Sequence, residues 1–176
     1  MIQWGRLITA MITPFDENLN VDFEAAVSLA VKLVNEGNTA LVITGTTGEA
    51  PTLTDEEKIN LYKVVKKSVD VPVIAGVGTN STKTTIENAK AAKKAGVDGL
   101  LVVTPYYNKP DQNSLYCHFK EVAASIDLPI MLYNVPGRTG CNLLPETVEK
   151  LAQIGNIAAV KEAGGNIVQG AAFYRL

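Results

Sequence analysis

The stretch NIAAVKEAGG, residues 156–165, carries a lysine at the end of a run of small and apolar residues. Ile, Ala and Val without polar alternation are typical of a parallel strand that is buried on both faces. Lys161 therefore brings an ammonium group to the edge of the predicted core, and the glycines that follow leave room for another group. We interpret Lys161 as a nucleophile, although a lysine at a strand end is more often a solvated surface group.

Strand-like segments of the same kind recur about every thirty residues, which is the length of a βα unit. The six segments are LITAMIT (7–13), ALVIT (40–44), VPVIAG (71–76), GLLVVT (99–104), LPIMLY (128–133) and IAAVK (157–161). Amphipathic helices are predicted between them, near residues 22–36, 54–69, 81–96, 113–125 and 145–155. Thr54 and Glu57 form a capping-box pattern, Ser81 is a predicted N-cap, and Pro145 opens the last helix. This pattern predicts an α/β fold like the TIM (βα)8 barrel, as one domain over residues 1–176, truncated to about six strands and five to six helices.

Composition excludes several classes of protein. The hydrophobic fraction of 47%, the charged fraction of 19% and the net charge of −2 are those of an ordinary globular chain. No basic run suggests a nucleic-acid partner, and the apolar runs are too short to cross a membrane. Cys117 and Cys141 fit no metal-binding spacing. The first residues lack a charged start followed by a long apolar run, so no secretory signal is expected. We therefore expect a cytoplasmic protein with reduced thiols, no metal, no nucleic-acid partner and no membrane contact.

The segments that follow the predicted strands share one chemical character. They are rich in Gly, Thr, Tyr and Asn, whereas the segments before the strands are plain. The six segments are TPFDEN, GTTGEAPT, GVGTNST, TPYYNKP, YNVPGRTG and KEAGGN. Because loops at the carboxyl ends of parallel strands build the active sites of such folds, these six segments predict one shared pocket.

Four of these segments also carry a resemblance to a known family. GTTGEAPTLT (45–54), TPYYNKP (104–110), LYNVPGRTG (132–140) and VKEAGGN (160–166) are similar to the signature segments of the dihydrodipicolinate synthase family. That family comprises pyruvate-dependent class I aldolases of the N-acetylneuraminate lyase superfamily. The resemblance runs from about Gly5 to Gln169. It implies a (βα)8 barrel, usually in a chain nearly twice this length, so that this sequence would be a short form that ends after the sixth strand.

The resemblance assigns catalytic roles to four residues. Lys161 would form a Schiff base with pyruvate, with no other cofactor. Tyr133 would shuttle protons as the carbinolamine collapses. Thr46 and Tyr107 would complete the proton relay, with Tyr107 usually contributed by a neighbouring subunit, so that a homo-oligomer, dimer or tetramer, is expected.

It assigns substrate binding to four more. Thr47 would bind the pyruvate carboxylate through its backbone, and Gly45 and Gly48 would let N–H groups form an anion nest. Arg138 would hold the carboxylate of L-aspartate 4-semialdehyde, because a planar guanidinium binds both oxygens at once. The implied reaction condenses the two substrates to 4-hydroxy-tetrahydrodipicolinate in lysine and diaminopimelate biosynthesis.

Physical chemistry is consistent with the role of Lys161. An amine attacks a carbonyl only when it is neutral, and a free lysine has a pKa of about 10.4. Desolvation at an apolar strand end lowers that pKa, as in other Schiff-base lysines.

Three alternatives stay open at this point. One is a pyruvate aldolase with a different aldehyde preference. Another is a catalytically impaired short chain that only binds a small carboxylate or assembles. The third is an open doubly wound domain with a phosphate-type ligand, against which the GVGTNST loop argues because it lacks the Gly-Lys-Ser/Thr ending of a P-loop.

Overall fold

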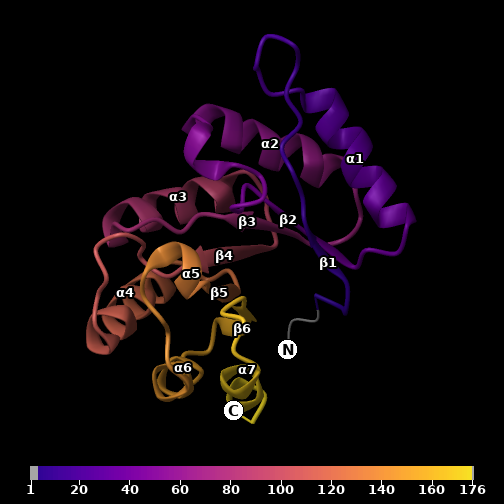
Figure 1. Ribbon diagram of the computed structural model, residues 1–176. Helices are drawn as coiled ribbons and strands as arrows, with labels where there is room; N and C mark the ends of the chain where they lie inside the picture. Colours follow the sequence, from indigo (N-terminus) through magenta and orange to yellow (C-terminus); the bar gives the residue numbers. More distant parts are fainter. Residues whose placement is uncertain (1–3, 176) are drawn as a thin grey trace. The chain divides into compact units, whose positions relative to one another are not determined.

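The computed structural model describes residues 4–175 and contains six strands, seven α-helices and one 3-10 helix among them (Figure 1). The strands are β1 (Ile8–Ala10), β2 (Ala40–Ile43), β3 (Val73–Gly76), β4 (Gly99–Val103), β5 (Ile130–Asn134) and β6 (Ile157–Glu162). The helices are α1 (Phe23–Asn35), η1 (Ala50–Thr52), α2 (Asp55–Ser68), α3 (Thr82–Lys94), α4 (Gln112–Ala124), α5 (Pro136–Thr139), α6 (Pro145–Leu151) and α7 (Ile167–Phe173). The predicted α/β class and the count of six strands are confirmed.

The strands follow one another in the sheet in the order of the chain, β1 to β6. β1, β2 and β3 pair in parallel, and so do β5 and β6. The Asp98 N–H, just before β4, donates to the Val73 carbonyl, and the Thr104 N–H, just after β4, donates to the Tyr133 carbonyl. A doubly wound sheet reverses its strand order at a switch point, and this sheet has no reversal, so the doubly wound alternative is wrong.

The chain divides into two compact units. The first comprises residues 1–77 and 91–100, and the second comprises residues 78–90 and 101–176. Strand β4 begins in the first unit and ends in the second. The single domain predicted for residues 1–176 stays a prediction.

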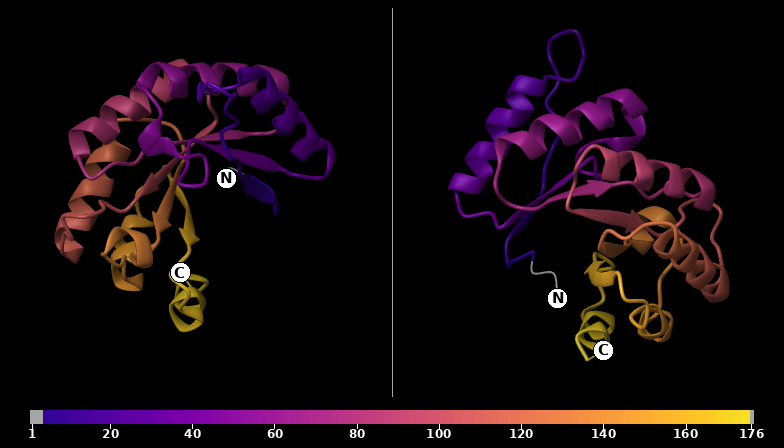
Figure 2. Two further views of the ribbon diagram at one scale, coloured as in Figure 1. Left: turned by 45° about the horizontal axis from the view of Figure 1, so that its top comes forward. Right: turned by 180° about the vertical axis from the view of Figure 1, so that it is seen from behind.

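Helices α1 and α2 pack against each other in the first unit (Figure 2). Asp22 caps α1 by accepting from the Ala25 N–H, and Thr54 and Glu57 close the predicted capping box at the start of α2. The apolar face of α2, which includes Leu61 and Val65, is buried. Local sequence signals therefore fixed the ends of these helices, and burial of one face holds them on the sheet.

The second unit shows the same agreement at its helix ends. The Ser81 hydroxyl accepts from the Thr84 N–H at the start of α3, and Pro145 occupies the first turn of α6. Helices α4 and α6 pack together, as do α6 and α7. The largest fully buried side chains of this unit include Leu115, Phe119 and Leu132.

Burial of the strands differs from the prediction at both ends of the strand order. Residues of β2 and β5 are all buried, and those of β3 and β4 nearly all, as predicted. Residues of β1 and β6 are half-buried or exposed instead. The physical reason is that β1 and β6 lie at the two ends of the strand order, so that within residues 4–175 each pairs with a single neighbouring strand. Their residues are therefore less covered than those of a strand with a neighbour on each side.

Candidate active site

Lys161 and Tyr133 lie against each other on adjacent strands. Tyr133 of β5 and Lys161 of β6 are direct partners in the parallel register. The Lys161 Nζ lies over the Tyr133 ring, 4.4 Å from its centre. Tyr133 is buried, and Lys161 is half-buried. The structure thus brings together the predicted nucleophile and the predicted proton shuttle.

The surroundings of Lys161 lower its pKa below the usual value, and the cause is desolvation by burial. The face of an aromatic ring attracts an ammonium group, although less strongly than a carboxylate would. Among the ion pairs of residues 4–175, none includes Lys161. The amine therefore loses hydration without gaining a counter-charge, which increases its neutral, nucleophilic fraction.

Arg138 lies in the short helix α5, directly after β5. Helix α5 ends at Gly140, which has φ 75°, and the Lys109 side chain packs beside it. Arg138 is exposed and lines a shallow groove. The groove residues are Tyr106, Tyr107, Lys109, Gly137, Arg138, Thr139 and Gly140. Two cationic side chains in one groove provide a binding place for a carboxylate.

Tyr107 lines the same groove as Arg138. Its φ of 77° is in the left-handed region, and its N–H donates to the Thr139 carbonyl at 3.0 Å. The side chain is 88% exposed. The predicted part of Tyr107 in a proton relay with Tyr133 and Thr46 stays a prediction.

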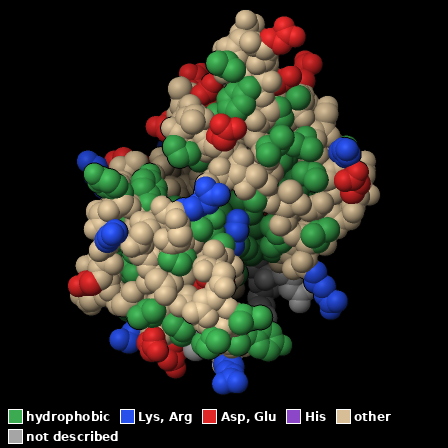
Figure 3. Space-filling view, viewed as in Figure 1, with side chains coloured by type: hydrophobic (Ala, Val, Ile, Leu, Met, Phe, Trp, Pro, Cys, Tyr) green, Lys and Arg blue, Asp and Glu red, His purple; other side chains and the backbone are tan. Residues whose placement is uncertain are grey.

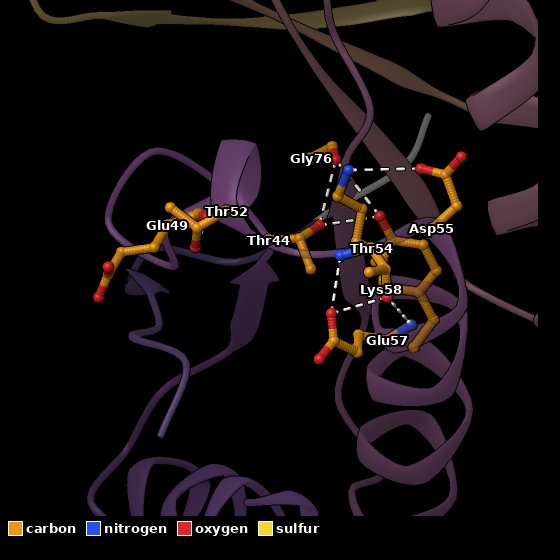
Figure 4. A network of polar contacts seen from close by, with 9 residues as sticks. Thr44, Glu49, Thr52, Thr54, Asp55, Glu57, Lys58 and Gly76 are labelled. Atoms are coloured by element: carbon orange, nitrogen blue, oxygen red, sulfur yellow. Dashed lines mark hydrogen bonds and ion pairs between the residues drawn. The ribbon is translucent and has the colours of Figure 1, made fainter. Parts of the chain in front are cut away.

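The loop after β2 begins with a strained residue, Thr44, in the first unit. Thr44 has φ 52°, which is rare for a β-branched residue. Its hydroxyl donates to the Gly76 carbonyl at 3.1 Å (Figure 4). The Tyr62 hydroxyl lies 2.8 Å from the Thr44 hydroxyl. A Cβ on Gly76 would overlap the Thr44 carbonyl group, so the glycine at the end of β3 permits this path. These contacts were not predicted, because only the fold brings the three residues together.

The four predicted residues of this loop follow Thr44 directly. Thr46 and Thr47 are exposed, whereas Gly45 and Gly48 are buried. The Gly48 N–H donates to the Gly45 carbonyl within the loop, and the Gly48 carbonyl accepts from the buried Thr13 hydroxyl. Gly48 is also closely packed, because a Cβ at this position would lie 3.2 Å from the Thr13 hydroxyl oxygen. The anion nest at Gly45 and Gly48 stays a prediction. Binding of pyruvate by Thr47 stays a prediction.

Among residues 4–175, no group of three or more His, Cys, Asp and Glu side chains could hold a metal ion. Cys117 and Cys141 are free thiols. Lys and Arg side chains are scattered singly or in pairs on the face shown in Figure 3. No helix within this range is both long and apolar enough to cross a bilayer.

Comparison with known proteins extends these observations. The sequence profile of the Dihydrodipicolinate synthetase family matches residues 3–174. A relative from Oceanobacillus iheyensis named 4-hydroxy-tetrahydrodipicolinate synthase is 53% identical, over 94% of this chain and 57% of its own length. A relative from Moorella thermoacetica with the same name is 53% identical, over 99% of this chain and 60% of its own length.

Solved structures give the same result. A dihydrodipicolinate synthase from Bacillus anthracis superposes with a TM-score of 0.97 at 49% identity, over 99% of this chain and 61% of that one. The synthase from Cyanidioschyzon merolae, crystallised with lysine bound, gives 0.95 at 49% identity, over 98% of this chain and 60% of that one.

The strand order and the match to solved structures define a chain of the TIM-barrel-like α/β class, as the sequence predicted. Within that class, the chain belongs to the dihydrodipicolinate synthetase family. It spans about three fifths of the length of the relatives that it matches.

The contact between Tyr62 and Thr44 leads to a test of the strained loop. Tyr62→Phe removes a buried hydroxyl that bonds to Thr44. We expect the free energy of unfolding to fall by about 1–2 kcal/mol, because the Thr44 hydroxyl loses a buried partner. Urea denaturation measures the change. Tyr116→Phe, on α4, is the matched control and should change the stability by less than about 0.5 kcal/mol. Equal stability of Tyr62→Phe and the wild type would show that the bond does not hold the loop.

The lowered pKa of Lys161 predicts a pH-dependent stability difference. In the unfolded chain Lys161 titrates at its usual value of 10.5, and in the folded chain it titrates lower. At a pH below the folded pKa, the free-energy cost of burying the charged Lys161 is therefore present in full. This cost decreases as the pH rises above the folded pKa and is absent above 10.5. Lys161→Met should raise Tm by roughly 1–3 °C at pH 7, since partial exposure limits the effect, and the gain should vanish near pH 11.

Differential scanning fluorimetry from pH 6 to pH 11 measures that difference. The control is Lys150→Met on the exposed surface of α6, which should give no pH-dependent gain. A Tm difference for Lys161→Met that stays constant with pH would contradict a lowered pKa.

Proposed function

We propose that this chain activates pyruvate as a Schiff base on Lys161 and condenses it with L-aspartate 4-semialdehyde, giving 4-hydroxy-tetrahydrodipicolinate. The observation that carries the proposal is the half-buried Lys161, whose pKa is lowered by desolvation and whose amine lies 4.4 Å from the Tyr133 ring centre. Relatives that carry the name of this synthase at 53% identity support the choice of reaction.

The first chemical step needs a neutral amine and a proton donor. The Lys161 nitrogen attacks the keto carbon of pyruvate, and the carbinolamine loses one water to give an iminium ion. Tyr133 lies beside the amine and is the proposed donor to the leaving hydroxyl. Thr46 and Tyr107 are proposed to connect Tyr133 to other proton acceptors without adding a charge to the site.

The second step uses the iminium ion as an electron sink. A proton leaves the pyruvate methyl group, and the resulting enamine attacks the aldehyde carbon of the second substrate. The amino group of that substrate then displaces Lys161, so that the amine is regenerated. No cofactor other than the covalent lysine is required in this scheme.

Recognition of the two carboxylates is proposed for two separate places. The backbone of the loop 45–48 would hold the pyruvate carboxylate, with Thr47 as the principal contact. Arg138 would hold the carboxylate of the aldehyde in the groove that it shares with Lys109 and Tyr107. A homo-oligomer in the cytoplasm is the proposed state of the protein, with Tyr107, an exposed side chain, completing the site of a neighbouring copy.

Two alternatives differ from this proposal in their observable results. A pyruvate aldolase with another aldehyde preference would form the same lysine adduct but would not need Arg138. A chain that only binds carboxylates or assembles would form no adduct. The half-buried amine has no counter-ion among the residues that the structure describes. This favours covalent chemistry over simple binding, because a lysine that only binds carboxylates works best when charged.

The covalent step predicts a specific chemical product. Sodium borohydride added with pyruvate should fix a reduced pyruvyl group on Lys161, detected by intact mass and peptide mapping. Lys161→Ala should abolish the adduct, and Lys150→Ala should leave it unchanged. Tyr133→Phe should slow its formation by about 10²–10⁴-fold, as expected for a proton-transfer group. A dominant adduct on Lys109 or Lys150 would overturn the assignment.

The aldehyde site predicts a separate change in kinetics. Arg138→Ala should raise KM for L-aspartate 4-semialdehyde by about 10–100-fold, since a charge-assisted pair of hydrogen bonds is lost, while the pyruvate adduct forms at its normal rate. Arg138→Lys should recover only part of the affinity, because an ammonium group lacks the planar fork. Arg6→Ala, at another exposed arginine, is the control. An unchanged KM in Arg138→Ala would favour a different aldehyde.

A further inference from the structure

Four polar side chains join β5 and β6 immediately beside the Lys161–Tyr133 pair. We call Asn134, Asn142, Glu162 and Gln169 the amide clasp. The Asn134 amide nitrogen donates to Glu162 Oε2 and to Asn142 Oδ1, both at 2.8 Å. The Gln169 amide nitrogen donates to the same two oxygens, at 3.1 and 3.0 Å. One carboxylate thus connects two strands and, through Gln169, helix α7.

The clasp is anchored at its buried end. Asn134 is completely buried, and its Oδ1 accepts from the Leu143 N–H at 2.9 Å. Both of its amide hydrogens and its carbonyl oxygen therefore have partners. A buried amide with three partners is costly to disrupt, because each lost partner leaves a desolvated polar atom.

Glu162 is also fixed from the other side by the glycine-rich segment. The Gly164 N–H donates to Glu162 Oε1. A Cβ on Gly164 would overlap that oxygen and would also lie close to Pro136, at the start of the helix that carries Arg138. The glycine at this position is explained by the close approach of the Glu162 carboxylate.

The register between β5 and β6 is irregular near their beginning. Ile130 pairs with Ile157, but Met131 pairs with Ala159, so β6 has one extra residue there. From that point the pairing continues to Tyr133 with Lys161 and Asn134 with Glu162. A shift of one residue would move a side chain to the opposite face of the sheet. The clasp joins Asn134 to Glu162, the pair that immediately follows Tyr133 and Lys161.

We propose that Glu162 is a positioning residue, which acts through the amide clasp to hold Tyr133 and Lys161 in register for the lysine chemistry. Successive side chains of a strand point to opposite faces, so the clasp lies on the other face from the amine. It fixes the backbone of both strands and does not touch the reacting atoms. This inference rests on the proposed function of Lys161.

A direct effect of the Glu162 charge on the amine is the main alternative. The two side chains form no ion pair within residues 4–175, and desolvation is the cause of the lowered pKa of Lys161. A nearby carboxylate would raise that pKa instead. The geometry therefore assigns Glu162 to positioning.

The test compares Glu162→Ala and Glu162→Gln with Glu149→Ala, at an exposed glutamate of α6. Each variant is also made in the Tyr133→Phe background. The rate of borohydride-fixed pyruvate adduct is measured per folded protein, from pH 6 to pH 10. Hydrogen exchange of the β5 and β6 amides, followed by mass spectrometry, measures the strand pairing without any substrate.

Glu162→Ala should slow adduct formation by about 10–100-fold, because small displacements of reacting groups have effects of this size. Glu162→Gln keeps an acceptor for Asn134 and should slow adduct formation by about 10-fold or less. In the Tyr133→Phe background the effect of Glu162→Ala should largely disappear, since there is no longer a tyrosine hydroxyl to position. Amide protection of β5 and β6 should fall in Glu162→Ala and stay normal in Glu149→Ala.

Three results would overturn the inference. Full additivity of Glu162→Ala and Tyr133→Phe would indicate a general structural role. Equal losses in the Ala and Gln variants, with a shifted pH profile, would indicate a charge effect. Unchanged protection of the β5 and β6 amides in Glu162→Ala would show that the clasp does not hold the two strands together. If Glu162→Ala does not fold, Gln169→Leu is tested instead. It should slow adduct formation less than Glu162→Ala, and this effect should also largely disappear in the Tyr133→Phe background.

The two proposals fail in distinguishable ways. Absence of an adduct in the wild-type chain would overturn the proposed function of Lys161, and hydrogen exchange would still decide whether the clasp holds the strands. A normal wild-type adduct combined with an unaffected Glu162→Ala variant would overturn only the positioning role.

Discussion

Pairing of β5 with β6 is the constraint on which the candidate chemistry depends. It places the Lys161 amine over the Tyr133 ring, in a position where burial removes water from the ammonium group. A carboxylate in the place of the ring would stabilise the protonated amine and suppress its reactivity. An aromatic side chain with a polar tip provides apolar cover and a proton donor together. The same contact would therefore serve both proposed roles, that of a neutral nucleophile for Lys161 and that of a proton donor for Tyr133.

Backbone strain is concentrated in the segments that follow strands. Thr44, at the end of β2, and Tyr107 and Lys109, after β4, all have φ between 47° and 77°. Such conformations cost of order 1–3 kcal/mol each and persist only where other contacts impose them. Tyr62 and Gly76 impose the path of Thr44, and the bond to the Thr139 carbonyl holds Tyr107. In each unit the rigid strands thus hold loops that carry exposed polar side chains.

Local signals in the sequence predicted much of the fold. The capping box at Thr54, the cap at Ser81 and the apolar strand runs depend on residues close in the chain, so pattern alone finds them. The strand-end lysine with small neighbours was equally visible. Exposure of β1 and β6 was missed because it depends on which strands lie beside them. The close packing of Gly48 against Thr13 and the path of Thr44 beside Tyr62 depend on partners that only folding brings near.

Strand β6 carries two adjacent residues, Lys161 and Glu162, with opposite electrostatic requirements. Lys161 needs an apolar setting in which its charge is disfavoured, whereas Glu162 needs amide donors that stabilise its charge. Because side chains alternate along a strand, the two settings can lie on opposite faces of the same backbone. Donors from Asn134, Gln169 and Gly164 satisfy the carboxylate, so it has no need of the ammonium group as a partner. Within residues 4–175 the amine is thereby left without a counter-ion, although an acidic residue is its immediate neighbour in the chain.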